Sequence, residues 1–99
     1  MSRDRVLSLI SISRAAGRIE SGEFAAEKAV IEGAARLVIV SRDASDKTKK
    51  KFRDKTSYRG IPYREYGTKQ ELGGAIGKTE RAIIALTDKG LAEALLKLL

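Results

Sequence analysis

The sequence predicts an α/β protein, a three-layer α/β/α sandwich in which helices cover both faces of a central sheet of about four strands. Segments with helical periodicity alternate along the chain with short segments of strand character. Two of these strand segments are almost continuously apolar, which is typical of strands covered on both faces. The 99 residues are 42% hydrophobic. We therefore expect one domain over residues 1–99 with a real core.

Glycines mark the ends of the first two expected helices. Apolar residues recur at helical spacing over residues 6–16, and Gly17 then stands where a helix C-terminus favours a left-handed residue. A second helical repeat over residues 25–30 lies between Gly22, which marks a tight turn, and Gly33.

The strand segments are short. The β-branched run over residues 37–40 suits a strand buried on both faces in a parallel sheet. Residues 63–66 alternate like a strand with one covered face. The four expected strands are residues 18–20, 37–40, 63–66 and 82–86.

Side-chain caps predict where the later helices begin. Ser45 can cap a third helix over residues 46–58. Thr68 and Glu71 form a capping box, in which a hydroxyl and a carboxylate satisfy the free amides of the first turn of a fourth helix. Asp88 can cap the last helix. That helix is expected to bury one stripe of leucines, namely Leu91, Leu95, Leu98 and Leu99.

The composition favours a binding protein over an enzyme. The chain has no cysteine, which excludes disulfides, thiolate zinc sites and cysteine nucleophiles. It also has no histidine, the commonest general base and metal ligand. The carboxylates are scattered and show no paired spacing. We therefore expect no catalytic residues, no metal and no cofactor.

Positive charge is concentrated in one segment. Residues 42–59 hold eight basic and three acidic residues, which gives +5 of the net charge of +7. A charge run of this kind is often only a solvated helix face. It can also attract nucleic acid, because clustered lysines and arginines release counterions from phosphates. The degree of clustering in so small a protein favours nucleic acid.

A glycine-rich segment, residues 73–79, ends like a phosphate-binding P-loop. A P-loop requires a glycine five positions before the glycine of its Gly-Lys-Thr, and Leu72 stands there. The context is also inverted, because the helix precedes the loop and the strand follows it. We interpret the segment as a helix end at Gly77 followed by an exposed polar loop. A small phosphotransfer or nucleotide-binding enzyme is a third functional hypothesis, and only this basic glycine loop supports it.

The N-terminus does not predict export. Residues 1–5 are basic enough for a signal peptide, but serines dilute the following segment and Arg14 comes before any cleavage site. The apolar runs are far shorter than the roughly 20 residues of a membrane helix. We expect a cytoplasmic protein with no membrane partner.

Several motifs, taken together, resemble the YlxQ-like bacterial branch of the kink-turn RNA-binding ribosomal proteins. They are residues 16–23 with Lys28, 37–45, 61–63, 72–78 and 85–88. They follow the family's order and spacing over nearly the whole chain. The resemblance implies an α/β/α sandwich with a mixed sheet. It also implies recognition of a sharply bent RNA whose internal loop exposes sheared G·A pairs.

The resemblance further implies a binding surface made of three segments. The turn and helix start over residues 21–28 would enter the widened RNA groove, where helix-start amides and a lysine suit phosphates. The loop 78–81 would pack on a flipped-out nucleotide, and the turn 42–43 would complete the surface. The implied RNA-binding residues are Ser21, Gly22, Glu23, Phe24, Ala25, Lys28, Arg42, Asp43, Lys78, Thr79, Glu80 and Arg81. The implied partners are kink-turn RNA, including ribosomal RNA, and the ribosome, and we expect a monomer without RNA.

The chain departs from the family's pattern at Phe24 and Ala25. Archaeal and eukaryotic members carry Asn-Glu there, and that glutamate reads a guanine edge. Glu23 or backbone groups would have to replace those hydrogen bonds. Phe24 itself has two interpretations, burial against the first helix or stacking on a base. Lys28 can likewise be an RNA contact or a solvated helix residue.

A different functional hypothesis follows from this departure. The chain would keep the fold, bind RNA weakly, and act as a ribosome-associated or assembly factor mainly through protein contacts.

Overall fold

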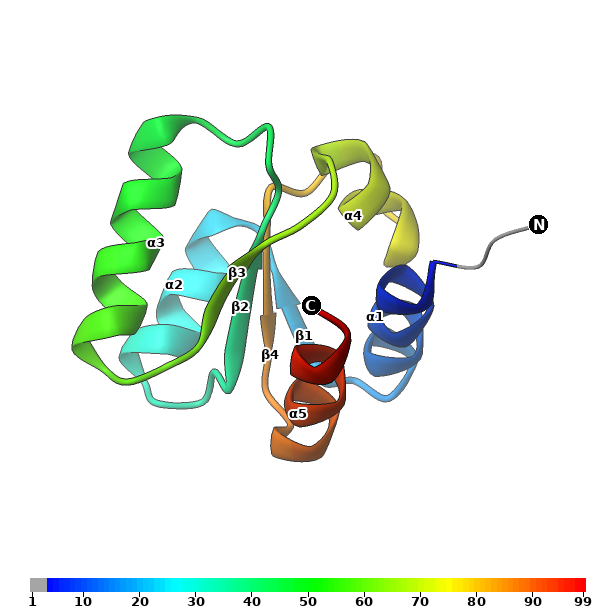
Figure 1. Ribbon diagram of the computed structural model, residues 1–99, viewed down its shortest axis with the longest axis horizontal. Coiled ribbons are helices and arrows are strands. Elements are labelled where there is room, and N and C mark those ends of the chain that lie inside the picture. The colour runs from blue at the N-terminus through cyan, green and yellow to red at the C-terminus, as the bar shows by residue number, and fades with distance from the viewer. Residues whose placement is uncertain (1–3) are drawn as a thin grey trace.

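The computed structural model describes residues 4–99, and over these residues the predicted order of helices and strands is confirmed. Residues 1–3, part of the basic start discussed above, lie outside the described residues. Figure 1 shows the elements: α1 (Arg5–Ala15), β1 (Ile19–Ser21), α2 (Glu23–Ile31), β2 (Leu37–Val40), α3 (Asp46–Tyr58), β3 (Tyr63–Glu65), α4 (Lys69–Ala75), β4 (Ile83–Leu86) and α5 (Lys89–Leu98).

The described strands form one mixed sheet in the order β1-β4-β2-β3. Strand β4 pairs antiparallel with both β1 and β2, and β2 pairs parallel with β3. The parallel environment expected for residues 37–40 is therefore present only on the β3 side. Both central strands are buried along their whole length. Burial on both faces, whatever the strand direction, explains why both are wholly apolar.

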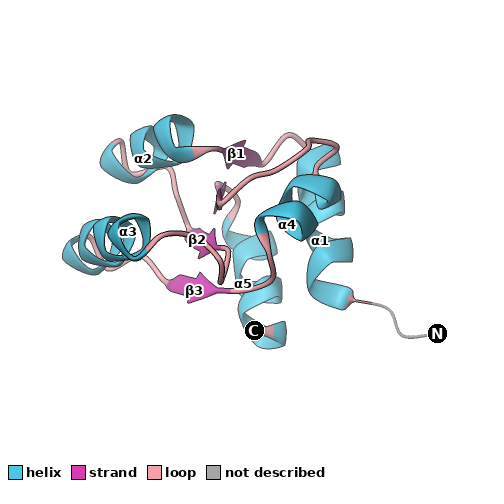
Figure 2. Ribbon diagram, turned by 90° about the horizontal axis from the view of Figure 1, so that it is seen from above, coloured by secondary structure: helices cyan, strands magenta, loops and turns pink. Residues whose placement is uncertain are grey.

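Helices cover both faces of the sheet, which confirms the α/β/α sandwich (Figure 2). Helices α2 and α3 form one layer, and α1, α4 and α5 form the other. Successive side chains of β2 point to opposite faces. Leu37 and Ile39 enter the core shared with α1, α4 and α5. Val38 and Val40 enter the core that contains Phe52 of α3.

The apolar stripe of α5 is displaced from the one expected. Ala92 and Leu95 are buried, and Leu96 and Leu99 pack partly on the same core. These positions follow the helical spacing i, i+3, i+4 and i+7 that begins at the alanine. Leu98 lies beside this stripe and is 39% exposed, so its predicted burial is wrong. None of the helices within residues 4–99 has the length and hydropathy needed to cross a bilayer.

The predicted caps are confirmed, and the structure adds one. Ser45, Thr68 and Asp88 each accept a backbone N–H at the start of α3, α4 and α5. Asp4 caps α1 in the same way through the Leu7 N–H at 2.9 Å. Its other oxygen accepts a 2.6 Å hydrogen bond from the Tyr66 hydroxyl, so the cap also ties α1 to the segment after β3.

Candidate nucleic-acid interface

The three predicted binding segments meet at one end of the sheet, the upper end in Figure 1. Strands β1 and β2 both end where β4 begins, because β4 runs antiparallel to each. The Gly22 N–H donates to the Ile83 carbonyl at 2.9 Å. The Ser41 N–H donates to the Ala82 carbonyl at 2.8 Å. These bonds hold the α2 start and the turn after β2 against the loop that leads into β4.

Most of the predicted site residues are accessible. Glu23, Phe24, Lys28, Arg42, Asp43, Lys78, Thr79 and Glu80 are exposed, and Ser21, Gly22, Ala25 and Arg81 are partly buried. Their accessibility is consistent with a binding surface, and their local contacts differ from segment to segment.

The start of α2 presents free backbone donors. Gly22 is its N-cap, with φ +91° and ψ 161°, a conformation that L side chains rarely adopt. No side chain of the described residues caps this helix. The amides of its first turn therefore keep their hydrogen-bonding capacity and the positive end of the helix dipole, a combination that suits an anionic oxygen.

Phe24 lies on the outer face of α2. The buried residues of that helix are Ala26, Ala29 and Val30. Phe24 is two positions before Ala26, about 200° around the helix, and its residue surface is 83% exposed. The hypothesis that Phe24 packs against α1 is therefore wrong. Lys28 lies one turn further along α2 and is also exposed.

Glu23 is engaged by helix α3. The Lys51 ammonium lies 2.9 Å from Glu23 Oε2 and 2.8 Å from Glu27 Oε1, and Lys55 lies 3.4 Å from Glu27 Oε2. The hydrogen bond from Lys51 is the main reason that the pKa of Glu27 is lowered, and the hydrogen bond to Glu27 is the main reason that the pKa of Lys51 is raised. A base edge would have to compete with Lys51 for the Glu23 carboxylate.

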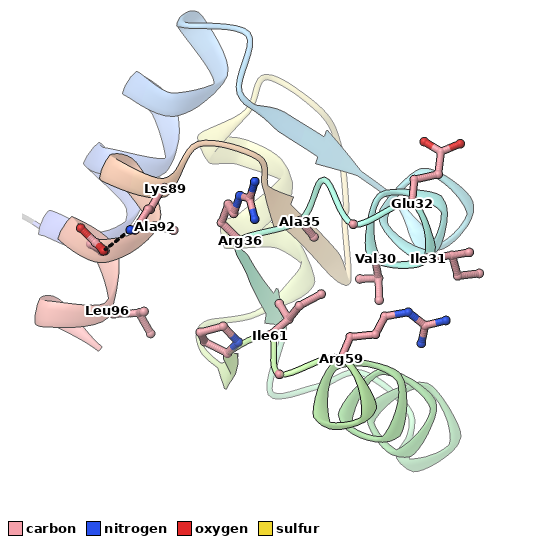
Figure 3. Close-up of a pocket in the computed structure, with 14 residues that line it drawn as sticks. Val30, Ile31, Glu32, Ala35, Arg36, Arg59, Ile61, Lys89, Ala92 and Leu96 are labelled. Atoms are coloured by element: carbon pink, nitrogen blue, oxygen red, sulfur yellow. Dashed lines mark ion pairs between the residues drawn. The ribbon is translucent and has the colours of Figure 1, made fainter.

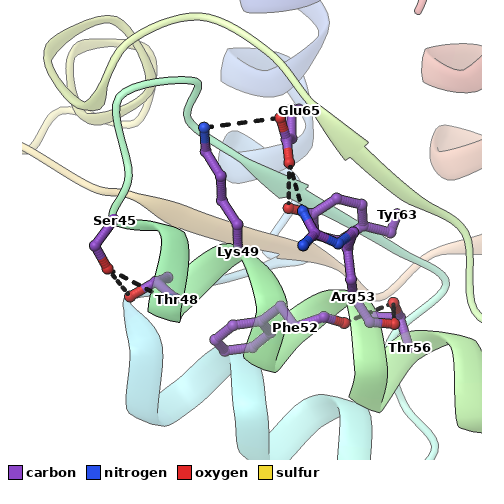
Figure 4. A network of polar contacts seen from close by, with 8 residues as sticks. All are labelled: Ser45, Thr48, Lys49, Phe52, Arg53, Thr56, Tyr63 and Glu65. Carbon is purple, nitrogen blue, oxygen red and sulfur yellow. Dashed lines mark hydrogen bonds and ion pairs between the residues drawn. The ribbon is translucent and has the colours of Figure 1, made fainter.

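Other cations of α3 are paired as well. Figure 4 shows Lys49, Arg53 and Tyr63 converging on Glu65. The Lys49 and Arg53 nitrogens lie 3.9 and 3.5 Å from its oxygens. The Tyr63 hydroxyl donates to Glu65 at 2.8 Å. Burial, and then this hydrogen bond, raises the pKa of Tyr63.

The charge of residues 42–59 therefore overstates the number of unengaged cations. Lys50 also pairs with Asp54 at 2.7 Å. Surface ion pairs are weak and exchange readily, so they do not remove the long-range positive field. Among the described residues, the basic groups of this segment that form no ion pair are Arg42, Lys47 and Arg59.

The turn after β2 is anchored to neighbouring elements. The Arg42 guanidinium lies over the Tyr66 ring, 5.4 Å from its centroid. Asp43 Oδ1 accepts the Lys69 N–H at 2.9 Å, at the first residue of α4. Desolvation would raise the pKa of Asp43, but hydrogen bonds such as this one outweigh it and lower the pKa. Asp43 thus has a structural role that its sequence position did not reveal.

The loop 78–81 lies directly on α4. The Lys78 N–H donates to the Gly73 carbonyl at 2.8 Å, which ends the helix as predicted. A Cβ at Gly73 would lie 2.8 Å from both Cα and N of Glu80. The glycine therefore permits a backbone-to-backbone contact that fixes the loop, and no phosphate-binding loop precedes a helix here. Sequence reasoning missed this contact, although a glycine pair inside a helix was its visible signal.

A hollow of about 610 Å³ lies at the other end of the sheet, between the ends of α2 and α3 and the start of α5 (Figure 3). Its apolar lining is aliphatic and includes Val30, Ile61 and Leu96. Arg36 and Arg59 flank Ile61 (Figure 3), and neither forms an ion pair with another described residue. None of the predicted site residues lines this hollow.

Comparison with known proteins agrees with the fold. The model of the ribosomal protein L7Ae/L30e/S12e/Gadd45 family matches residues 4–96. The chain is 37% identical to the RNA-binding protein YlxQ of Bacillus subtilis (strain 168) over 91 residues, 92% of this chain and 91% of the relative. It is 34% identical to the RNA-binding protein YlxQ of Enterococcus faecium over 92 residues, covering 93% and 88% of the two chains.

Two solved structures extend the comparison. A Bacillus halodurans protein of unknown function has a TM-score of 0.94 and 41% identity, with 97% of each chain covered. The Giardia lamblia 15.5kD RNA binding protein has a TM-score of 0.80 and 25% identity, with 98% of this chain and 90% of that chain covered. From the family match and these relatives, the chain belongs to the ribosomal protein L7Ae/L30e/S12e/Gadd45 family.

Proposed function

We propose that this chain is a cytoplasmic RNA-binding protein that recognises kink-turn motifs, with ribosomal RNA and the ribosome as its partners. The observation that carries the proposal is the meeting of the α2 start, the turn after β2 and the loop before β4 at one end of the sheet. Two relatives with about a third of their residues identical are named RNA-binding proteins, which supports the same conclusion.

Recognition would depend on RNA shape more than on base-edge hydrogen bonds. Ala25 has no polar side-chain atom, and Glu23 is paired with Lys51. The groups that remain are the free amides of the first turn of α2 and the ammonium of Lys28, both of which suit phosphate oxygens. Phosphate contacts discriminate only where the RNA backbone is bent to match them. A kink-turn supplies such a bend, and an unbent duplex does not.

The test compares a kink-turn RNA with an unbent duplex of the same length, by fluorescence anisotropy at about 50 and 200 mM salt. The wild-type chain should bind the kink-turn more tightly. Each phosphate that it neutralises should add roughly 0.7–0.9 to the log–log salt slope. Equal affinity for the two RNAs would refute the proposal.

Lys28→Ala and Lys50→Ala form a matched pair of variants for this assay. Both remove an exposed lysine, but Lys50 lies on α3 and pairs with Asp54. Loss of one charge-assisted contact, about 1.5–3 kcal/mol, should reduce the preference of Lys28→Ala for the kink-turn by roughly 10- to 150-fold. Lys50→Ala should weaken both RNAs alike, because a diffuse field carries no shape information. The opposite result would place the recognition surface on α3.

The aliphatic hollow supports a second candidate function, that of an assembly factor acting through a protein partner. Arg36 and Arg59 would then pair with carboxylates at the edge of a partner segment. A partner should stay bound after nuclease treatment and be lost from Arg36→Glu, while kink-turn affinity is kept. Loss of every co-purifying protein on nuclease treatment would exclude this candidate.

A further inference from the structure

We propose that Phe24 forms one wall of a subsite for a single unpaired nucleobase, in a hollow that α2 lines together with Glu20 of β1 and Thr87. The proposal rests on the proposed function and deepens it, because it assigns a nucleobase to one side chain of the segment 21–28, in a hollow that neither of the other two segments lines. It is carried by the exposure of the ring, the shape of the hollow beside it, and the charges around that hollow.

The exposure of Phe24 leaves its ring available to a partner. The phenylalanine side chain has no polar atom that water could hydrogen-bond, yet the residue is 83% exposed in a well-defined helical turn. The buried face of α2 is fully occupied by smaller residues, so the ring is not a displaced core residue. A flat aromatic surface beside a helix N-terminus offers a π-face on which a nucleobase can stack.

A hollow of about 280 Å³ lies beside the ring. Its apolar lining includes Ala25 and Ala29, whose single methyl groups leave open the space that larger side chains would fill. Glu20 of β1 and Thr87, just after β4, contribute polar groups. The hollow thus combines an aromatic wall, an aliphatic lining and hydrogen-bonding groups at its edge, which is the arrangement that a single base requires.

The charges indicate which group enters the hollow. Glu20 and Glu32 both line it, against the single ammonium of Lys28. Two carboxylates repel a phosphate, so the group that enters is an uncharged base edge. A carboxylate accepts hydrogen bonds and donates none. The subsite therefore favours the amino-bearing bases adenine, cytosine and guanine over uracil, whose single N–H lies between two carbonyl oxygens.

The subsite is separate from the loop that the family resemblance assigns to a flipped-out nucleotide. The lining of the hollow contains no residue of the turn 42–43 or of the loop 78–81. Lys28 lies one helical turn after Phe24, so its ammonium can contact the backbone of the nucleotide whose base is stacked. A base held here would be a neighbour of the nucleotides at the α2 start.

The chain has no tryptophan, which makes a direct fluorescence test possible. Phe24→Trp places the single indole at the proposed subsite. Tyr58→Trp is the matched control, because Tyr58 is 86% exposed, lies at the end of α3 and does not line the hollow. Titration with kink-turn RNA should quench the fluorescence of Phe24→Trp and leave that of Tyr58→Trp nearly unchanged. Equal responses of the two variants would overturn the subsite.

Affinity supplies the second measurement. Phe24→Leu keeps an apolar side chain but removes the π-face, and should weaken kink-turn binding by roughly 5- to 150-fold. Tyr58→Leu should change it little. The stacked nucleotide can be located by 2-aminopurine scanning and then replaced with uridine. This replacement should lower the RNA affinity of the wild-type chain more than it lowers the RNA affinity of Phe24→Leu. Unchanged affinity of Phe24→Leu, with kink-turn preference intact, would overturn the subsite alone. A wild-type chain without kink-turn preference would overturn the proposed function, and the subsite with it.

Discussion

Two adjacent glycines of α4 allow the contact between that helix and the loop 78–81 to be tested. At Gly73, a Cβ would lie 2.8 Å from Cα and N of Glu80 and 2.9 Å from the carbonyl carbon of Thr79. At Gly74, a Cβ would meet nothing within 4 Å. Both residues lie in the same helix. Gly73→Ala and Gly74→Ala therefore add the same methyl group, with and without a clash against backbone.

The expected difference in free energy of unfolding between the two variants follows from the surroundings of the two glycines. In a helix interior, alanine is favoured over glycine by roughly 0.8–1 kcal/mol, and both variants gain this amount in full or in part. Only Gly73→Ala also has to displace the loop backbone, and overpacking of this kind typically destabilises by about 1–3 kcal/mol. The difference between the two free energies of unfolding should therefore be about 1–3 kcal/mol, with Gly74→Ala the more stable.

Thermal unfolding followed by circular dichroism measures this difference. For a chain of about this length, 1 kcal/mol corresponds to a shift of roughly 4–8 °C in Tm. We expect the Tm of Gly73→Ala to lie roughly 5–20 °C below that of Gly74→Ala. Kink-turn affinity should fall in Gly73→Ala alone, because only there is the loop displaced. Equal Tm values for the two variants would show that the loop is not fixed by this contact.

Three further outcomes are expected. The Tyr66 hydrogen bond, which outweighs desolvation, lowers the pKa of Asp4 below its usual 3.8. The stabilisation is present at pH values above 3.8 and is lost as the pH falls through the lowered pKa. In a series of urea-unfolding measurements, the free energy of unfolding of Asp4→Asn should therefore depend less on pH in the acid range than that of the wild-type chain. Thr68→Ala removes one half of the capping box and should lower the free energy of unfolding by about 0.5–2 kcal/mol in the same assay, with no loss contradicting the cap. Gly22→Ala meets no neighbouring atom, but at φ +91° and ψ 161° it occupies a region that is essentially restricted to glycine. It should therefore lower the free energy of unfolding by roughly 1–3 kcal/mol and weaken kink-turn binding. Wild-type stability and affinity would argue against the need for glycine there.

Local signals were sufficient to predict the elements of the fold. Each of the three predicted N-caps has a hydroxyl or carboxylate that can reach a free amide, namely Ser45, Thr68 and Asp88. The helix starts could therefore be predicted from residue spacing alone. The error at Leu98 came from counting large leucines and overlooking Ala92, a small residue at which the buried stripe begins. The order of the strands in the sheet could not be predicted from the sequence, because it depends on which apolar segments pair across long intervals of chain.

The sequence predicted where the segments of the candidate site lie, but not which contacts their side chains make. The resemblance to a family placed the three segments on one surface, and the hydrogen bonds of Gly22 and Ser41 to the start of β4 show how they are held together. The pairing of Lys51 with Glu23 could not be read from the sequence, because the two residues lie 28 positions apart. Nor could the direction of Phe24, since one aromatic residue at a helix start fits either burial or exposure.

The central place of β4 has a consequence for the order in which the molecule folds. Strand β1 pairs with β4, and β2 has β4 as its antiparallel neighbour, so the sheet has no continuous middle until residues 83–86 are present. During synthesis from the N-terminus, β1 and the start of α2 are made before β4, the strand with which β1 pairs, which lies more than sixty residues downstream. The hydrogen bond from Gly22 to Ile83 then forms at the same time as the sheet closes. A nascent chain that ends before β4 therefore has the basic helix α3 but lacks the hydrogen bonds that hold the α2 start and the turn after β2 together. The proposed selectivity for kink-turn RNA would arise only when the last strand enters the sheet.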